Sequence, residues 1–202
     1  MPQLARGALT PDPKDPSKFF LFGGATPLDN QSFPGWASPL PASQSLWSYD
    51  TVADAWSSFN MSRFGITRPA SGGYTYVPEK GLLFWFNGMQ DNGSAIETQV
   101  INDTTQFLGG MTIVDLNNQT ARNISTTEVS NKPRVRSDLL YVPLAGTEGI
   151  LILMGGGEKP YQDLTHEWKG KRHQYICSLS VVLFANCYLL YRLTCKILHS
   201  NS

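Results

Sequence analysis

Histidine and cysteine, the side chains most used for metal binding and nucleophilic catalysis, occur only in the last part of this 202-residue chain. The cysteines are ten and eight positions apart, whereas zinc ligands usually come in pairs with about two to four residues between them. A Ser-His-Asp hydrolase triad needs a histidine, and the chain has none before the last part. We therefore expect no catalytic residue, no metal site and no cofactor. The residues concerned are His166, His173 and His199 and Cys177, Cys187 and Cys195.

Glycine pairs and aspartates are the remaining candidates for chemistry. Gly109-Gly110 is not followed by Lys-Ser or Lys-Thr, as a phosphate-binding loop requires, so we interpret it as a turn. Asp50 together with Asp54 or Asp115 offers a carboxylate pair for acid–base work on one face of the fold. These aspartates lie where hairpin turns are expected, and aspartate commonly accepts hydrogen bonds from the backbone of such turns. We expect the turn-capping role.

The elements that would position any site repeat along the chain. An apolar run that ends in two small residues occurs at 18–24, 82–88 and 150–156. The connecting segment 46–56 also matches 112–121, about 65 positions later. Each apolar run is expected to be a buried strand, and glycines after it allow the backbone to turn where a Cβ atom would clash. This repetition predicts an all-β fold built from four-stranded units.

The repeated unit resembles that of the kelch family, which combines apolar residues, a Gly-Gly pair and a Tyr separated by six residues from a Trp. Tyr49 and Trp56 have this spacing. Residues 136–156 are more narrowly similar to the extracellular kelch proteins of filamentous fungi, which are called galactose-oxidase-like after their propeller. The second unit departs from the pattern, because Val114 and Ala121 replace the Tyr and Trp.

The resemblance implies a partial kelch-type β-propeller of about two to three four-stranded blades over residues 9–168, followed by an apolar helical tail at 169–202. Complete propellers close a ring of about four to eight blades. An open stack leaves apolar faces and strand edges in water. We therefore interpret the chain as a fragment of a larger propeller, as a truncated gene model, or as a chain that needs a partner.

The charge balance argues against nucleic acid as a partner. The chain has 16 basic and 16 acidic residues and a formal net charge of zero. Residues 17–157 contain no basic stripe, which is the electrostatic signature of most nucleic-acid binders. We expect no nucleic-acid partner.

Asn-X-Ser/Thr sequons are more frequent than this composition predicts by chance, which indicates N-glycosylation in the secretory pathway. Loops rich in Asn, Ser and Thr would also produce such matches. Residues 1–18 contain no apolar signal segment, although the leader of a fragment would lie upstream. We expect an extracellular or cell-surface protein. The six candidate asparagines are Asn30, Asn60, Asn92, Asn102, Asn118 and Asn123.

The sequence changes character after Gly157. Residues 174–191 carry no charge over 18 positions, and basic residues flank them on both sides. A membrane-spanning helix needs about 20 apolar residues, and Gln174 and Asn186 make this stretch only moderately hydrophobic. Two interpretations of 169–202 stay open: a single-pass membrane anchor through 174–191, or untranslated sequence such as a retained intron.

The loops are the remaining candidates for function. The long insertion 25–45 carries Phe33 and Trp36, and aromatic side chains on a rigid scaffold often contact ligands. Trp36 folded back onto its own loop is the alternative. A second long loop, 89–108, is polar and expected to face solvent. We expect a non-catalytic module that binds a protein or glycan ligand at the rim loops; the alternatives are a fragment of a carbohydrate-directed, galactose-oxidase-like enzyme and a nonfunctional gene fragment.

Overall fold

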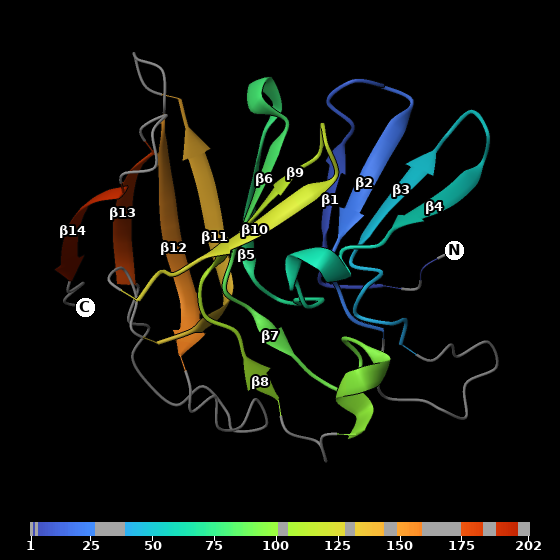
Figure 1. Ribbon diagram of the computed structural model, residues 1–202. Coiled ribbons are helices and arrows are strands. Elements are labelled where there is room, and N and C mark those ends of the chain that lie inside the picture. Colours follow the sequence, from blue (N-terminus) through green and yellow to red (C-terminus); the bar gives the residue numbers. More distant parts are fainter. Residues whose placement is uncertain are drawn as a thin grey trace, which may run out of the picture.

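The protein folds mostly as antiparallel β-sheet, in agreement with the expected all-β class (Figure 1). The computed structural model describes residues 2, 4–26, 39–100, 105–127, 132–143, 149–158, 175–183 and 189–197, the last two ranges in their backbone only. Within these ranges the helices are short 3-10 turns in the connections between strands. They are η1 (Ser62–Phe64), η2 (Pro78–Lys80) and η3 (Ile96–Val100).

Two four-stranded sheets have the same strand order, and every neighbouring pair of strands is antiparallel. The expected four-stranded unit is therefore formed twice. The first sheet consists of β1 (Ala8–Pro11), β2 (Lys18–Phe22), β3 (Leu46–Asp50) and β4 (Ala55–Phe59). The second sheet consists of β5 (Gly73–Val77), β6 (Leu82–Phe86), β9 (Met111–Asp115) and β10 (Thr120–Ile124).

A third sheet follows the second along the chain. It pairs β11 (Arg134–Val142) with β12 (Ile150–Glu158), which correspond in order to the first two strands of each four-stranded sheet. A small sheet of β7 (Met89–Gln90) and β8 (Gln106–Phe107) lies within the connection from β6 to β9.

The sheets stack face to face, and each sheet has two distinct faces. Because side chains alternate along a strand, the pairing register assigns each residue to one face. We call the faces that carry Leu9 with Leu21, Tyr74 with Trp85, and Leu139 with Leu153 the front faces of the first, second and third sheets. The back faces carry Phe20 with Phe22, Phe84 with Phe86, and Ile152 with Met154, respectively.

Two apolar cores lie between the sheets. The back face of the first sheet packs on the front face of the second, where the ring of Phe22 meets Trp85 edge-on with centroids 5.8 Å apart. The back face of the second sheet packs on the front face of the third, where Phe84 and Phe86 share a core with Leu153. Both contacts therefore join a back face to the next front face.

The small-residue pairs that end the apolar runs adopt left-handed backbone conformations, as expected from their glycines. Both residues have positive φ in Gly23-Gly24, in Asn87-Gly88 and in Gly155-Gly156. Asparagine tolerates this region better than most residues with a Cβ atom, so Asn87 preserves the turn at the one position where the sequence lacks glycine.

Three further left-handed residues recur at intervals of 65 positions. They are Arg6, Ser71 and Arg136, with φ angles of 63°, 57° and 56°. The main-chain N–H of Ser71 donates to the carbonyl oxygen of Arg6 at 3.0 Å, and that of Arg136 donates to the carbonyl oxygen of Ser71 at 2.7 Å. Backbone hydrogen bonds thus connect successive sheets at equivalent positions.

The tail after residue 158 lies largely outside the described residues. The backbone of β13 (Tyr175–Leu183) pairs antiparallel with that of β14 (Leu189–Ile197). In the described part of the chain, no helix is long and apolar enough to span a bilayer. The apolar helix expected at 169–202 and the membrane anchor at 174–191 stay predictions.

Candidate functional site

The connections between strands fall into two groups at opposite ends of the sheets (Figure 1). At the tight-turn end, drawn at the top, short turns join β1 to β2, β3 to β4, β5 to β6 and β9 to β10. The long connections 23–45, 60–72 and 87–110 leave and re-enter the sheets at the loop end. Binding residues are commonly found on loops that a rigid scaffold positions, so the loop end is the first candidate site.

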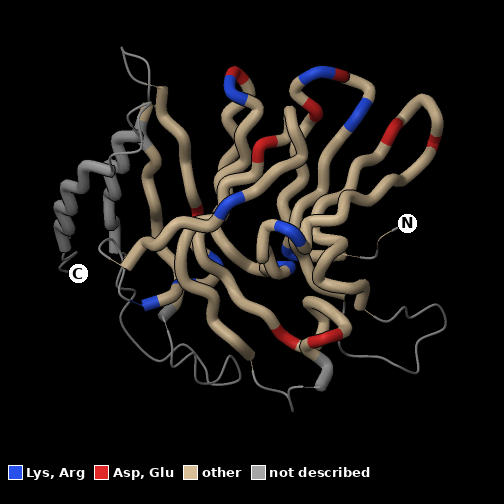
Figure 2. Tube along the Cα trace, viewed as in Figure 1, with Lys and Arg blue, Asp and Glu red and all other residues tan. Residues whose placement is uncertain are grey.

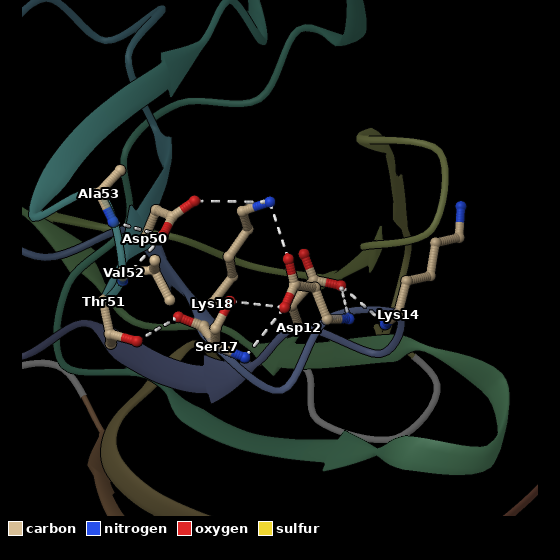
Figure 3. Close-up of polar contacts among 9 residues, drawn as sticks. Asp12, Lys14, Ser17, Lys18, Asp50, Thr51, Val52 and Ala53 are labelled. Carbon is tan, nitrogen blue, oxygen red and sulfur yellow. Dashed lines mark hydrogen bonds and ion pairs between the residues drawn. The ribbon is translucent and has the colours of Figure 1, made fainter.

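The tight-turn end carries a network of charged and polar side chains that connect two hairpins (Figure 3). Lys18 Nζ lies 2.8 Å from Asp15 Oδ2 and 3.6 Å from Asp50 Oδ2. The main-chain N–H and the hydroxyl of Ser17 donate to Asp15 at 3.0 and 2.6 Å. The bond from Lys18, followed by those from Ser17, lowers the pKa of Asp15 to about 2. These contacts give the network a structural role.

Asp50 and Asp115 cap equivalent turns, which confirms the role expected from the sequence. Asp50 Oδ1 accepts the N–H groups two and three positions later, both at 2.9 Å, and Asp115 Oδ1 does the same at 2.9 and 3.2 Å. Asp54 instead accepts a hydrogen bond from the Tyr49 hydroxyl at 2.6 Å. The ring of Tyr49 packs against its cross-strand partner Trp56, with centroids 4.9 Å apart.

At the loop end, the buried side chain of Arg68 holds two long connections together. Its guanidinium donates to the carbonyl oxygens of Leu40, Pro41 and Gln44 at 3.0, 2.7 and 2.6 Å. It also donates to the carbonyl oxygen of Ser94, in the loop of the second sheet, at 3.3 Å. Burial lowers the pKa of Arg68 to about 10, so the group stays charged at neutral pH. Arg68 therefore fixes one loop against the other.

Backbone hydrogen bonds also join these two loops. The N–H of Thr26 donates to the carbonyl oxygen of Gly93 at 2.8 Å, and the N–H of Ile96 donates to that of Leu40 at 3.3 Å. The predicted rim contacts Phe33 and Trp36 lie between these tied positions, in the segment 27–38, which is outside the described residues.

A further ion pair connects the segment before β1 with the loop of the second sheet. Arg6 Nη2 lies 3.0 Å from Asp91 Oδ2, and the aspartate is the more buried of the two. The Asp91 side chain also accepts the N–H of Gly93 at 3.0 Å, while the Thr98 hydroxyl donates to the Asp91 carbonyl oxygen at 2.6 Å. The sequence predicts that the loop 89–108 faces solvent. The loop contains a buried polar turn, whose polar groups form hydrogen bonds with one another.

A pocket of about 60 Å³ opens at the loop end between residues 65–69 and 108–110. Asn87 lines it, and the Oδ1 atom of Asn87 is buried without a protein hydrogen-bond partner. Pockets for drug-sized ligands measure about 300–1,000 Å³. This pocket has the size for bound water and is too small for a sugar ring.

The sequon asparagines lie in different surroundings. Asn60 directly follows β4, Asn118 precedes β10, and Asn123 lies within β10; all three are exposed. Asn92 is half-buried, and the Ser94 of its sequon is fully buried and bonded to Asp91. Asn30 and Asn102 lie outside the described residues.

Other chemistry has little support in the residues that the structure describes. Among them, no three His, Cys, Asp or Glu side chains group as metal ligands. The three histidines lie outside these residues. Basic and acidic residues are interspersed along the hairpins of the tight-turn end (Figure 2).

Comparison with known proteins assigns no family to the chain. No family model matches it, and no curated protein is similar enough to count as a relative.

Proposed function

We propose that this chain is part of a kelch-like β-propeller that binds a protein or glycan ligand at its loop end without catalysis. The observation that carries the proposal is the clamp formed by Arg68, which joins the long loops of two neighbouring sheets. A surface whose loops are held in advance loses less conformational entropy when it binds. The equivalent strand order of two stacked sheets supports the propeller assignment.

Phe33 and Trp36 are the proposed ligand contacts. Both belong to a segment whose flanking residues, Thr26 and Leu40, are hydrogen-bonded to the loop of the second sheet. Aromatic rings stack on the apolar faces of sugars and anchor protein interfaces. Either ligand class would use the same pair.

We also propose an extracellular or cell-surface location. Exposed sequons at Asn60, Asn118 and Asn123 support it, because a glycan attached there would project into solvent. Membrane anchoring through 174–191 is a separate part of this proposal, supported by the uncharged 18-residue stretch.

The binding proposal is tested with a printed glycan array and the full chain. Trp36→Ala should abolish sugar binding while Trp56→Ala, the same change at the tight-turn end, should retain it. If no sugar binds, a photo-crosslinker placed at position 36 tests for a protein ligand in the source organism.

Two results would overturn the proposal. One is ligand binding that survives Phe33→Ala and Trp36→Ala together, because the contact would then lie elsewhere. The other is copper-dependent oxidation of a sugar by the purified chain, which would favour the galactose-oxidase-like enzyme.

A further inference from the structure

The front face of the first sheet is apolar and open. The pairing register places Leu9, Phe19, Leu21, Trp47 and Tyr49 on this face. Leu9 and Phe19 are 58% and 36% exposed, and the other three are partly exposed. Contiguous exposed apolar surface of this kind usually marks an interaction site.

The equivalent positions of the other two sheets are buried. Phe19 corresponds to Leu83 in the second sheet and to Leu151 in the third, which are 0% and 2% exposed. In both cases the back face of the preceding sheet covers them. Among the described residues, the front face of the first sheet has no such cover.

In the third sheet it is the back face whose apolar side chains are exposed. Met154 corresponds to Phe22 and Phe86 on the other back faces; it is 38% exposed, whereas both phenylalanines are fully buried. Leu140, its neighbour on the same face, is 47% exposed. Among the described side chains, the first sheet therefore has an open front face and the third sheet an open back face.

We propose that these two faces bind each other between two copies of this chain. The back face of the third sheet in one protomer would cover the front face of the first sheet in its partner. Both contacts inside the chain already join a back face to a front face, so the second copy supplies the kind of surface that each open face lacks.

In a pair of copies related by a twofold axis, both contacts would form at once. A front-to-back contact is heterologous, and such contacts either close into a ring or continue as an open filament. Three sheets from each of two protomers make six, which falls within the range of about four to eight that closed propellers contain and favours a ring with a twofold axis. These surfaces are separate from the loop end, so ligand binding there does not test them.

The experiment measures the mass of the full chain in solution by light scattering over a range of concentrations. We expect about twice the 22.3 kDa of one chain. Leu9→Lys, on the front face, and Met154→Lys, on the back face, should each give a folded protein that no longer forms the closed dimer. The control is Val52→Lys, which makes the same type of change at an 84% exposed site in the tight turn after β3 and should stay dimeric.

A mixture of the two variants separates this arrangement from others. Leu9→Lys retains an intact back face and Met154→Lys retains an intact front face, so the mixture should regain a dimer through one contact. Circular dichroism checks that both variants are folded. A monomeric wild-type chain, a mixture that stays monomeric, dimers unaffected by either variant, or cross-links showing that another segment of a longer native polypeptide covers Phe19 would each overturn the proposal.

Discussion

The main-chain N–H of Ser71 lies 3.0 Å from the carbonyl oxygen of Arg6, and both residues have left-handed backbone conformations. Arg136 repeats the relationship with Ser71 at 2.7 Å. A left-handed conformation costs about 1–2 kcal/mol for a residue with a Cβ atom. The protein has this unfavourable conformation at three equivalent positions. At each of them the residue takes part in a hydrogen bond between successive sheets.

Replacing Ser71 by glycine should stabilise the protein. Glycine removes the left-handed strain, and it also removes the Ser71 hydroxyl, which is buried without a hydrogen-bond partner. We expect the free energy of unfolding to rise by about 1 kcal/mol, as measured by urea denaturation. Ser71→Val is the matched comparison and should destabilise, because a β-branched residue tolerates positive φ poorly. A loss of stability in Ser71→Gly would contradict this account of the strain.

Replacing Arg68 by methionine should destabilise the protein by about 3 kcal/mol or more, because four carbonyl oxygens, one buried and three partly buried, lose their donor. The loops should separate, so limited proteolysis within 27–38 should become faster. Arg122→Met, at an exposed position of β10, is the control and should leave both measurements unchanged. Unchanged proteolysis in Arg68→Met would refute the clamp.

The stabilising effect of Asp15 should disappear in acid. Its pKa is lowered to about 2 in the folded state by the bond from Lys18, against about 3.9 in an unfolded chain. Its contribution is therefore complete above about pH 4 and is lost as the pH falls towards 2. The melting temperatures of wild type and Asp15→Asn should differ slightly at neutral pH, since the group is exposed, and converge through this window. A gap that stays constant down to pH 2 would contradict the assignment.

Glycan occupancy should follow exposure when the chain is expressed in a eukaryotic secretory host. Asn60, Asn118 and Asn123 are exposed and should be modified, whereas Asn92 should stay unmodified because the Ser94 of its sequon is buried in a polar turn. Peptide mapping after enzymatic deglycosylation in heavy-oxygen water measures each site. Full occupancy of Asn92 in the folded product would show that this turn opens or forms late.

The sequence predicts the sheets better than it predicts the contacts at the loop end. Periodic apolar runs and paired small residues carry a local signal, which is why the strands β2 and β6 and the turn at Asn87-Gly88 follow from spacing alone. Arg68 carries no such signal. Its partners in 40–44 and at Ser94 come together only when two sheets stack, and an isolated arginine in a loop usually faces solvent.

The spacing of Tyr49 and Trp56 shows a second limit. Their spacing predicts a hairpin, and the two rings do meet across β3 and β4. Which face of the first sheet they occupy depends on the register in which β3 pairs with β2. Only that register identifies Tyr49 and Phe19 as neighbours on an uncovered face.

The stacking order also determines how the molecule should come apart. The second sheet shares an apolar core with a neighbour on each face, whereas the first and third sheets each share one such core among the described side chains. Where each layer contacts only its neighbours, opening starts from the outer layers, so amide protons of β6 should exchange with solvent most slowly. The 65-residue interval of Arg6, Ser71 and Arg136 then marks the module by which such a chain can lengthen or shorten during evolution, because adding or deleting one whole module leaves the contacts inside the others intact.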